Sequence, residues 1–197
     1  MKKSLLIAAA VMFVASSSFA IDLPPVGYIG LFKDAAHDPN PPINGSDYWV
    51  CPAQYGNFQC WIWCLPSHNG LQAAEFAVSF PATVVTLATV QNPLITVALG
   101  SLAAGISVAF GEGSCQQDWV WLHQLTMMQL GPPVLAAKID IIPHPGTLPV
   151  PAYQFATCEA GYPIEPCIYL VPLYICWPPD WYYGVQQSNW GAIKSLF

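Results

Sequence analysis

The chain contains a long stretch without any charged side chain, which lies between Glu75 and Glu112. Valine, isoleucine, threonine and phenylalanine are frequent in it, and these residue types are enriched in β-strands. Proline and glycine divide it into four short runs, over residues 76–80, 83–90, 94–99 and 106–110. Because each run has the length of a strand and stops near a turn-forming residue, the stretch predicts four strands at the centre of a β-sheet core.

The same stretch is also long and apolar enough for a transmembrane helix over residues 84–110. In such a helix Asn92 and Pro93 would lie in mid-membrane, and no Lys or Arg flanks either end as an anchor. Threonine and valine dominate where leucine would be expected. Strands are therefore the favoured interpretation.

Shorter runs of the same character occur on both sides of this stretch. We expect further strands over residues 26–32, 48–50, 59–65, 119–130, 134–142, 153–158 and 168–176. The run 119–130 also fits a short helix, but it lacks good helix caps. The pattern amounts to about nine or ten strands, and the 20 prolines argue against long helices. The prediction is an all-β protein, an immunoglobulin-like or jelly-roll-type β-sandwich with long Pro/Gly-rich loops and disulfides.

The amino terminus has the pattern of a secretory signal peptide. Two lysines are followed by an apolar run over residues 4–14, and small residues lie at Ser18 and Ala20. We expect residues 1–20 to be removed after Ala20 and residues 21–197 to form a single domain. The predicted location is secreted, periplasmic or on a bacterial cell surface, with no membrane span after cleavage.

All seven cysteines lie beyond the predicted signal peptide, and an exported chain meets oxidising conditions. They are Cys51, Cys60, Cys64, Cys115, Cys158, Cys167 and Cys176. We expect three disulfides and one remaining thiol, because the number is odd. Connectivity does not follow from spacing, but Cys51–Cys60 and Cys158–Cys167 are local candidates because each pair brackets a turn-rich loop.

The charge balance argues against several partners. Only 8% of residues are charged, there is no Arg, and residues 21–197 hold three Lys against eleven acids, a net charge of −8. Nucleic acids and anionic membrane surfaces bind mainly through clustered Lys and Arg. We therefore expect neither as a partner.

Two Trp-x-Trp pairs are the most distinctive motifs. Residues i and i+2 of a strand share a face, so Trp61 and Trp63 form one aromatic pair, and Trp119 and Trp121 form a second. Core packing is the favoured interpretation of this face, because aromatic side chains dominate core energetics. The alternative is a pair of exposed platforms that stack on sugar rings.

Signals for metal binding or catalysis are weak. The loop over residues 34–47 is rich in Asp and Asn, which leaves calcium binding open, although a solvated loop is favoured. Cys60 and Cys64 have a spacing that zinc sites use, but no second half follows. The sequence has no nucleophile elbow, P-loop or dinucleotide-binding glycine motif. We therefore expect no catalytic residue, no metal site and no cofactor.

Two resemblances add to this reading. Residues 74–81, followed by 84–87, resemble a strand pair of cohesin-like and other immunoglobulin-like extracellular β-sandwiches, which implies the same fold. The chain is also similar to uncharacterised secreted, cysteine-containing bacterial proteins. The segments that carry this likeness are residues 27–36, 61–66, 158–163 and 190–194. That group implies export but no activity, so no functional residue is carried over from it.

The predicted function is an exported, non-catalytic structural or surface and matrix protein. The alternative is a carbohydrate-binding module that uses Trp61, Trp63, Trp119 and Trp121. The expected partner is accordingly a glycan or another surface protein.

Overall fold

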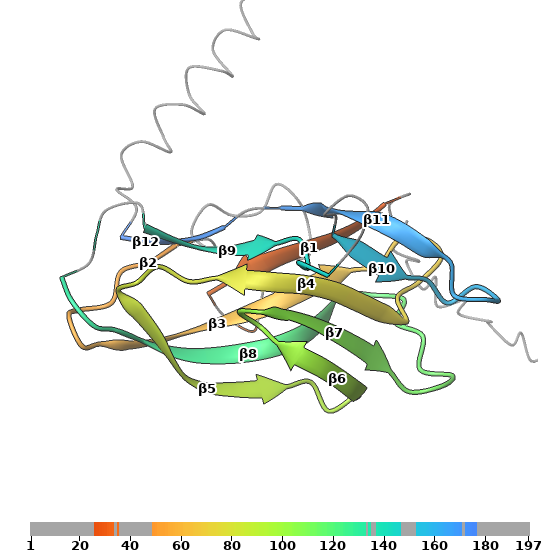
Figure 1. Cartoon of the computed structure of the whole chain (residues 1–197), viewed down its shortest axis with the longest axis horizontal. Coiled ribbons are helices and arrows are strands. Elements are labelled where there is room, and N and C mark those ends of the chain that lie inside the picture. Colours follow the sequence, from red (N-terminus) through yellow and green to blue (C-terminus); the bar gives the residue numbers. More distant parts are fainter. Residues whose placement is uncertain are drawn as a thin grey trace, which may run out of the picture.

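The computed structural model describes residues 26–33, 35, 49–132, 134, 137–146, 153–170 and 172–176 (Figure 1). This part of the chain contains twelve strands and no helix, which confirms the predicted all-β class. The strands are β1 (Gly27–Phe32), β2 (Trp49–Val50), β3 (Asn57–Leu65), β4 (Ala73–Ser79), β5 (Val84–Gln91), β6 (Ile95–Ser101), β7 (Gly105–Phe110), β8 (Val120–Gln129), β9 (Ala137–Ile142), β10 (Gln154–Ala156), β11 (Ile164–Tyr169) and β12 (Leu173–Ile175).

The strands form two layers of a sandwich that are joined along one side. One layer runs β11-β1-β3-β8-β5, and in the other β4 pairs with β7 on one side and with β10 and β9 on the other. β6 continues from β7, and β12 and β2 continue from β9. Since β11 pairs with both β1 and β10, it connects the layers. On the opposite side β5 pairs only with β8 and β6 only with β7 among the described residues, so the sandwich has an open edge there.

The main hydrophobic core lies between the two layers. Its fully buried side chains come from alternate positions of the paired strands, as expected for faces that point inward. One layer contributes Ile29, Leu31, Ile62, Leu122, Leu125 and Met127, and the other contributes Phe76, Val78, Ile139, Ile141 and Leu173. At roughly 1.5–3 kcal/mol for each fully buried large aliphatic or aromatic side chain, this face supplies the main stabilisation of the fold.

The prediction that all four uncharged runs form the centre of the core is wrong for two of them. β4 and β7 are largely buried, whereas most residues of β5 and β6 are exposed. The physical reason is their place in the sheets, because each has only one neighbour and lies at the open edge. The absence of charged residues therefore does not predict which of these strands is buried.

The structure also settles two of the other expected strands. The run 119–130 is strand β8, as favoured. Residues 164–176 hold two strands, β11 and β12, where one was expected over 168–176. β11 includes Pro166, which pairs with Gln154 of β10 and lies one residue before the pairing with β1 begins at Cys167, so it stands at the margin of that ladder.

Some predictions lie outside the described residues. They are the signal peptide over residues 1–20 and almost all of the calcium-candidate loop over residues 34–47. Within the described ranges, no helix has the length and hydrophobicity needed to cross a membrane.

Candidate functional site

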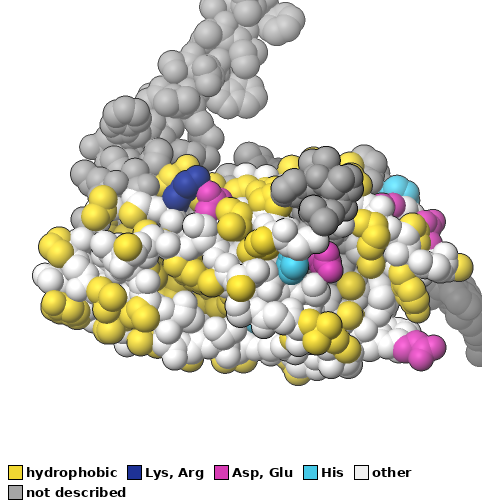
Figure 2. Space-filling model, in the orientation of Figure 1, with side chains coloured by type: hydrophobic (Ala, Val, Ile, Leu, Met, Phe, Trp, Pro, Cys, Tyr) yellow, Lys and Arg dark blue, Asp and Glu magenta, His cyan; other side chains and the backbone are white. Residues whose placement is uncertain are grey.

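The open edge of the sandwich exposes large apolar side chains. Among the described residues of β5, β6 and the turn between them, the exposed ones are Leu87, Val90, Leu94, Val97 and Leu99. Leu99 is 66% exposed, and the others are 46–50% exposed. Figure 2 shows the region of β5 and β6 as hydrophobic and uncharged polar atoms, while the charged side chains of this face lie elsewhere. This edge is therefore an apolar, uncharged surface on an otherwise acidic protein.

A tight turn holds β5 and β6 in place at this edge. Asn92 is 4% exposed, its Nδ2 donates to the carbonyl of Trp121 at 2.6 Å, and its Oδ1 accepts from the backbone N–H of Leu94 at 2.9 Å. The backbone N–H of Asn92 also donates to the carbonyl of Leu122 at 3.0 Å. Because asparagine side chains mimic backbone turns in this way, the turn is anchored onto β8 and the edge strands have a defined position.

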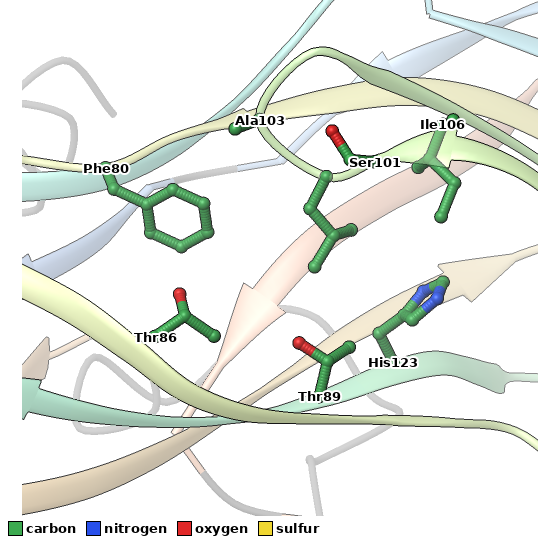
Figure 3. Close-up of a pocket in the computed structure, with 9 residues that line it drawn as sticks. Phe80, Thr86, Thr89, Ser101, Ala103, Ile106 and His123 are labelled. Atoms are coloured by element: carbon green, nitrogen blue, oxygen red, sulfur yellow. The ribbon is translucent and has the colours of Figure 1, made fainter.

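A pocket of about 370 Å³ opens between the two edge strands (Figure 3). Its apolar lining comes from Phe80, Leu102, Ala103 and Ile106. Hydroxyl groups of Thr86, Thr89 and Ser101 line its more exposed parts, and the imidazole of His123 lies between Ile106 and Thr89 in the close-up. The pocket is thus mainly apolar and contains a few polar groups, which is the usual composition of a ligand site.

A β-bulge lets two consecutive residues of β8, Leu122 and His123, face the interior of the sandwich. His123 pairs with Ile62, but Trp121 already pairs with the next residue, Trp63, so that Leu122 is the extra residue on β8. A bulge of this kind changes which side chains of a strand face inward. Both Leu122 and His123 are consequently buried, at 0% and 2% exposure, although they are neighbours in sequence.

The environment of His123 keeps its imidazole neutral. Burial lowers the pKa of His123 from 6.5 to about 4, since the charged form loses its hydration. The Phe76 ring contacts it edge-on at a centroid distance of 6.4 Å. Its Nδ1 is buried and has no hydrogen-bond partner within the described part of the chain. A buried polar atom in this state is unusual and calls for an explanation.

The cysteines form two bridges that differ from the local candidates. The disulfides are Cys51–Cys176 and Cys115–Cys158, at sequence separations of 125 and 43. Both predicted local pairings are therefore wrong, because Cys60 and Cys167 point into the core. The parallel pairing of β2 with β12 instead brings Cys51 next to Cys176.

Three cysteines, Cys60, Cys64 and Cys167, are free and buried, where one remaining thiol was expected. Burial raises the pKa of each thiol, and the neighbouring Cys167 raises that of Cys64 further. Cys64 on β3 and Cys167 on β11 are separated by β1, which implies roughly 10 Å between their backbones at usual strand spacing. That separation exceeds the roughly 7 Å that a disulfide can span, which explains the absence of the third bridge.

The four tryptophans lie on the outer face of the β1-β3-β8 layer, opposite the main core. Cys60, Ile62 and Cys64 occupy the inner face of β3 and are fully buried. On the outer face a second cluster contains Phe32, Trp61, Trp63, Trp119, Trp121 and Leu170. Trp63 is only 9% exposed, and Phe32 contacts Trp119 edge-on at 5.9 Å. The tryptophans are therefore packed against one another in a small outer core, and their role as a sugar platform remains a prediction.

A polar cluster joins the turn after β3 to β11. The Ser67 hydroxyl donates to Glu165 at 2.8 Å, and the Asn69 side-chain amide donates to the same carboxylate at 2.6 Å. His68 is exposed, and no described contact joins it to Ser67. The arrangement satisfies a buried hydroxyl and ties the turn after β3 to strand β11. Within the described residues no group of three or more His, Cys, Asp or Glu side chains could hold a metal ion.

Comparison with known proteins gives a likeness of fold. No protein-family model matches the chain, and no curated protein is similar to it in sequence. The sixth cohesin of scaffoldin B from Acetivibrio cellulolyticus is 10% identical, covers 74% of this chain and 94% of its own, and has a TM-score of 0.47.

Two further cohesin structures are also similar to the chain. CaCohA2 from Clostridium acetobutylicum is 8% identical over 79% of this chain and 92% of its own, with a TM-score of 0.48. A non-cellulosomal cohesin from Archaeoglobus fulgidus is 11% identical over 59% and 73%, with a TM-score of 0.39. The sequence resemblance of residues 74–81 and 84–87 to cohesin-like sandwiches agrees with these matches in fold alone, and no residue role is transferred from them.

Sequence reasoning missed the pocket and its histidine. His123 was one of four scattered histidines, and nothing in its neighbours suggested a ligand. A signal was nevertheless present, because the apolar positions of residues 120–129 change parity between Leu122 and Leu125. Such a change in a two-residue period indicates a bulge, and it would have placed His123 on the inner face.

Proposed function

We propose that the protein is an exported, non-catalytic module that binds another surface protein through the open β5–β6 edge. The two disulfides support export, because such bonds form and persist in oxidising compartments. The exposed apolar and uncharged surface of the β5–β6 edge supports protein binding over a purely structural role.

The observation that carries this proposal is the exposure of two long, uncharged edge strands. β5 has eight residues and β6 has seven, and neither contains a charged residue or a proline. Natural proteins usually protect such edges with lysines, prolines or covering segments, because the unpaired backbone groups recruit other strands. Large exposed apolar patches likewise indicate an interaction surface. In the part of the chain that the structure describes, this edge lacks such protection, and a partner that covers it is the best explanation.

The geometry also defines what kind of partner fits. An extended segment can add to β6 through backbone hydrogen bonds, while alternate side chains contact Val97 and Leu99. The surface lacks charge, so the segment is expected to be uncharged and apolar at alternate positions. One of the similar solved structures is a cohesin in complex with a dockerin, but the present proposal rests on the edge of this chain.

The carbohydrate-binding alternative receives less support from the same structure. An exposed, coplanar pair of rings would favour stacking on sugars, whereas Trp63 is nearly buried and all four tryptophans belong to one packed cluster. We therefore place the interaction surface at the β5–β6 edge and not at the tryptophans.

Site-specific photo-crosslinking tests the proposal in the bacterium that exports the protein. A benzoylphenylalanine at Val97 or Leu99 should give one discrete cross-link to a different protein. The same probe at Tyr162 or Ile164, which are 50% and 60% exposed at the β10–β11 end, serves as the matched control. A cross-link only to a second copy would replace the proposed partner with self-association, and equal patterns at both ends would refute the proposal.

A further inference from the structure

We propose that the pocket between β5 and β6 holds the inward-facing side chains of the extended partner segment that adds to β6, and that two of these side chains are large and aliphatic. This inference rests on the proposed function, because it concerns the same partner segment. It goes further in naming the pocket that selects the partner and the side chains that fill this pocket.

The inward-facing positions of β6 carry almost no side chain. Ala98 pairs with Val108 and Gly100 pairs with Ile106, and the side chains of Val108 and Ile106 are buried in the core. Residues directly opposite each other in neighbouring strands share a face of the sheet, so Ala98 and Gly100 lie on the inner face as well. Both are nevertheless exposed. The interior of the sandwich is therefore open to solvent beside β6.

The edge strand of the other layer repeats this arrangement. Thr86 pairs with Met127 and Thr89 pairs with Leu125, and both partners are fully buried, so the two threonines lie on the inner face of β5. Both threonines are exposed, and both line the pocket. Figure 3 shows them across the pocket from Ile106. The inward side chains of one more strand would occupy the space between these two edges.

The volume of the pocket fits more than one side chain. The pocket holds about 370 Å³. A cavity of about 150 Å³ is enough for one benzene ring, so the pocket has room for two side chains of roughly that size. Successive inward-facing residues of a strand are two positions apart, so two neighbouring side chains can enter together.

The walls of the pocket select apolar side chains. Phe80, Leu102 and Ile106 line it, and no Lys, Asp or Glu is among the described residues that do so. The imidazole of His123 also faces the pocket, and burial lowers its pKa to about 4, so it is uncharged at neutral pH. A charged side chain would lose its hydration there without meeting a counter-charge. Aliphatic side chains lose nothing of this kind and gain by burial.

A second copy of this chain does not offer such side chains from the same edge. If two copies paired through β6, each would present Ala98 and Gly100 to the other at the inward positions, and pairing through β5 would present Thr86 and Thr89. These residues are too small to fill a pocket of about 370 Å³. The occupant is accordingly a different polypeptide, with large aliphatic residues two positions apart.

The test uses two short peptides, acetylated and amidated at their ends, in which threonine alternates with either leucine or alanine. Each peptide is titrated into the protein while methyl signals are followed by NMR. We expect the leucine peptide to bind saturably and roughly ten-fold tighter than the alanine peptide, because only leucine fills the pocket. Its leucine methyl groups should give nuclear Overhauser contacts to Leu102 and Ile106, and its threonine methyl groups should contact Val97 and Leu99.

Two matched variants of β5 separate the pocket from the outer face of the sheet. Thr89→Phe places a ring in the pocket, whereas Val90→Phe places the same ring on the outer face, since Val90 pairs with Gln124 and does not line the pocket. The preference for leucine over alanine should disappear in Thr89→Phe and remain in Val90→Phe. Because the Overhauser contacts are measured on the unmodified protein, the test holds even if a variant folds poorly.

Several results would overturn the proposal. They are no saturable binding of the leucine peptide, leucine contacts only to Val97 and Leu99, and an unchanged preference in Thr89→Phe. Contacts to Ile106 in the protein without peptide, from a second copy or from a segment of this chain outside the described residues, would also overturn it.

The pocket and the edge proposals fail separately. Edge cross-links together with leucine contacts confined to the outer face would keep the edge as the interaction surface and remove the pocket. Binding of the leucine peptide in the pocket without any cross-link in the bacterium would keep the pocket and remove the surface-protein partner.

Discussion

At the scale of single residues, a bulge in β8 lets two consecutive residues, Leu122 and His123, face the interior while Trp121 stays on the outer face. His123 lies inside the sandwich, where it meets Phe76 and the pocket. A polar side chain is thereby fixed in an apolar site, and its pKa follows from that position.

The lowered pKa of His123 predicts a pH-dependent stability. The native imidazole stays neutral down to about pH 4, whereas the unfolded chain binds a proton below about pH 6.5. The unfolded state thus binds more protons between these values, so the free energy of unfolding is fully retained above pH 6.5 and falls as the pH decreases toward 4. At pH 4.5 the loss should be about 2–3 kcal/mol.

Urea unfolding of the native protein and of His123→Leu at pH 7.5 and pH 4.5 measures this loss. The variant keeps every carboxylate, so the difference between the two pH dependences reports the histidine alone. Equal dependences in the two proteins would contradict the expected role of His123.

Gly70 predicts a second effect at the scale of residues. Its φ of +76° is unfavourable for residues with a Cβ, and a Cβ there would lie 2.5 Å from Cys115 Sγ and 2.8 Å from Cys158 Sγ. Gly113 has a similar φ of +75°, but its Cβ would meet nothing within 4 Å. Gly70→Ala should therefore lower the free energy of unfolding by about 1–3 kcal/mol more than Gly113→Ala, since only the first adds a steric clash. Chemical denaturation of both variants measures the difference. Equal losses of unfolding free energy would show that the disulfide shifts aside without strain and would contradict this prediction.

At the scale of elements, the shortest strands depend on a covalent link. β2 has two residues and β12 has three, and their parallel pairing involves only two residue pairs. The Cys51–Cys176 bridge follows directly after both strands. A bridge at this position holds together a pairing that hydrogen bonds alone would support weakly.

Removal of this bridge should loosen one end of the sandwich. On the chain-entropy model, a link across 125 residues contributes about 5 kcal/mol, and the 43-residue link Cys115–Cys158 contributes about 4 kcal/mol. The double variant Cys51→Ser/Cys176→Ser should expose the amides of β2 and β12 to hydrogen exchange, while β3 and β8 stay protected. The double variant Cys115→Ser/Cys158→Ser is the control, because its effect should centre on the β10–β11 end. A uniform increase in exchange in both variants would contradict this division.

At the scale of the whole molecule, the sandwich is closed on one side and open on the other. β11 connects the layers by pairing with β1 and β10, and the main core lies between them. The open side carries the apolar edge strands and the pocket. The proposed interaction surface therefore lies where the sheet hydrogen bonding of the described strands ends.

The whole fold also determines the state of the thiols. Unreduced protein should show three reactive thiols after denaturation and none that reacts quickly when native, because Cys60, Cys64 and Cys167 are buried and their pKa values are raised. Thiol titration with a disulfide reagent, with and without denaturant, measures both numbers. A single thiol after denaturation would restore the third bridge that the odd cysteine count suggested, and seven would exclude both disulfides.

Local residue types were sufficient to predict the strands and the fold class. The runs at 76–80, 83–90, 94–99 and 106–110 each correspond to a strand within a few residues, because β-branched residues and turn residues act over short distances. The same holds for β1 and β8. The acidic composition and the presence of disulfides also followed from sequence alone.

Which face of each strand is buried, and which cysteines meet, was decided by the tertiary structure. The uncharged runs at β5 and β6 resemble those at β4 and β7 in sequence, yet only the first two became exposed edges, since exposure depends on the number of neighbours in the sheet. The link between Cys51 and Cys176 depends on a pairing 125 residues apart. Both outcomes are non-local, because they depend on which strands pair, and residue type and spacing carry no direct information about that.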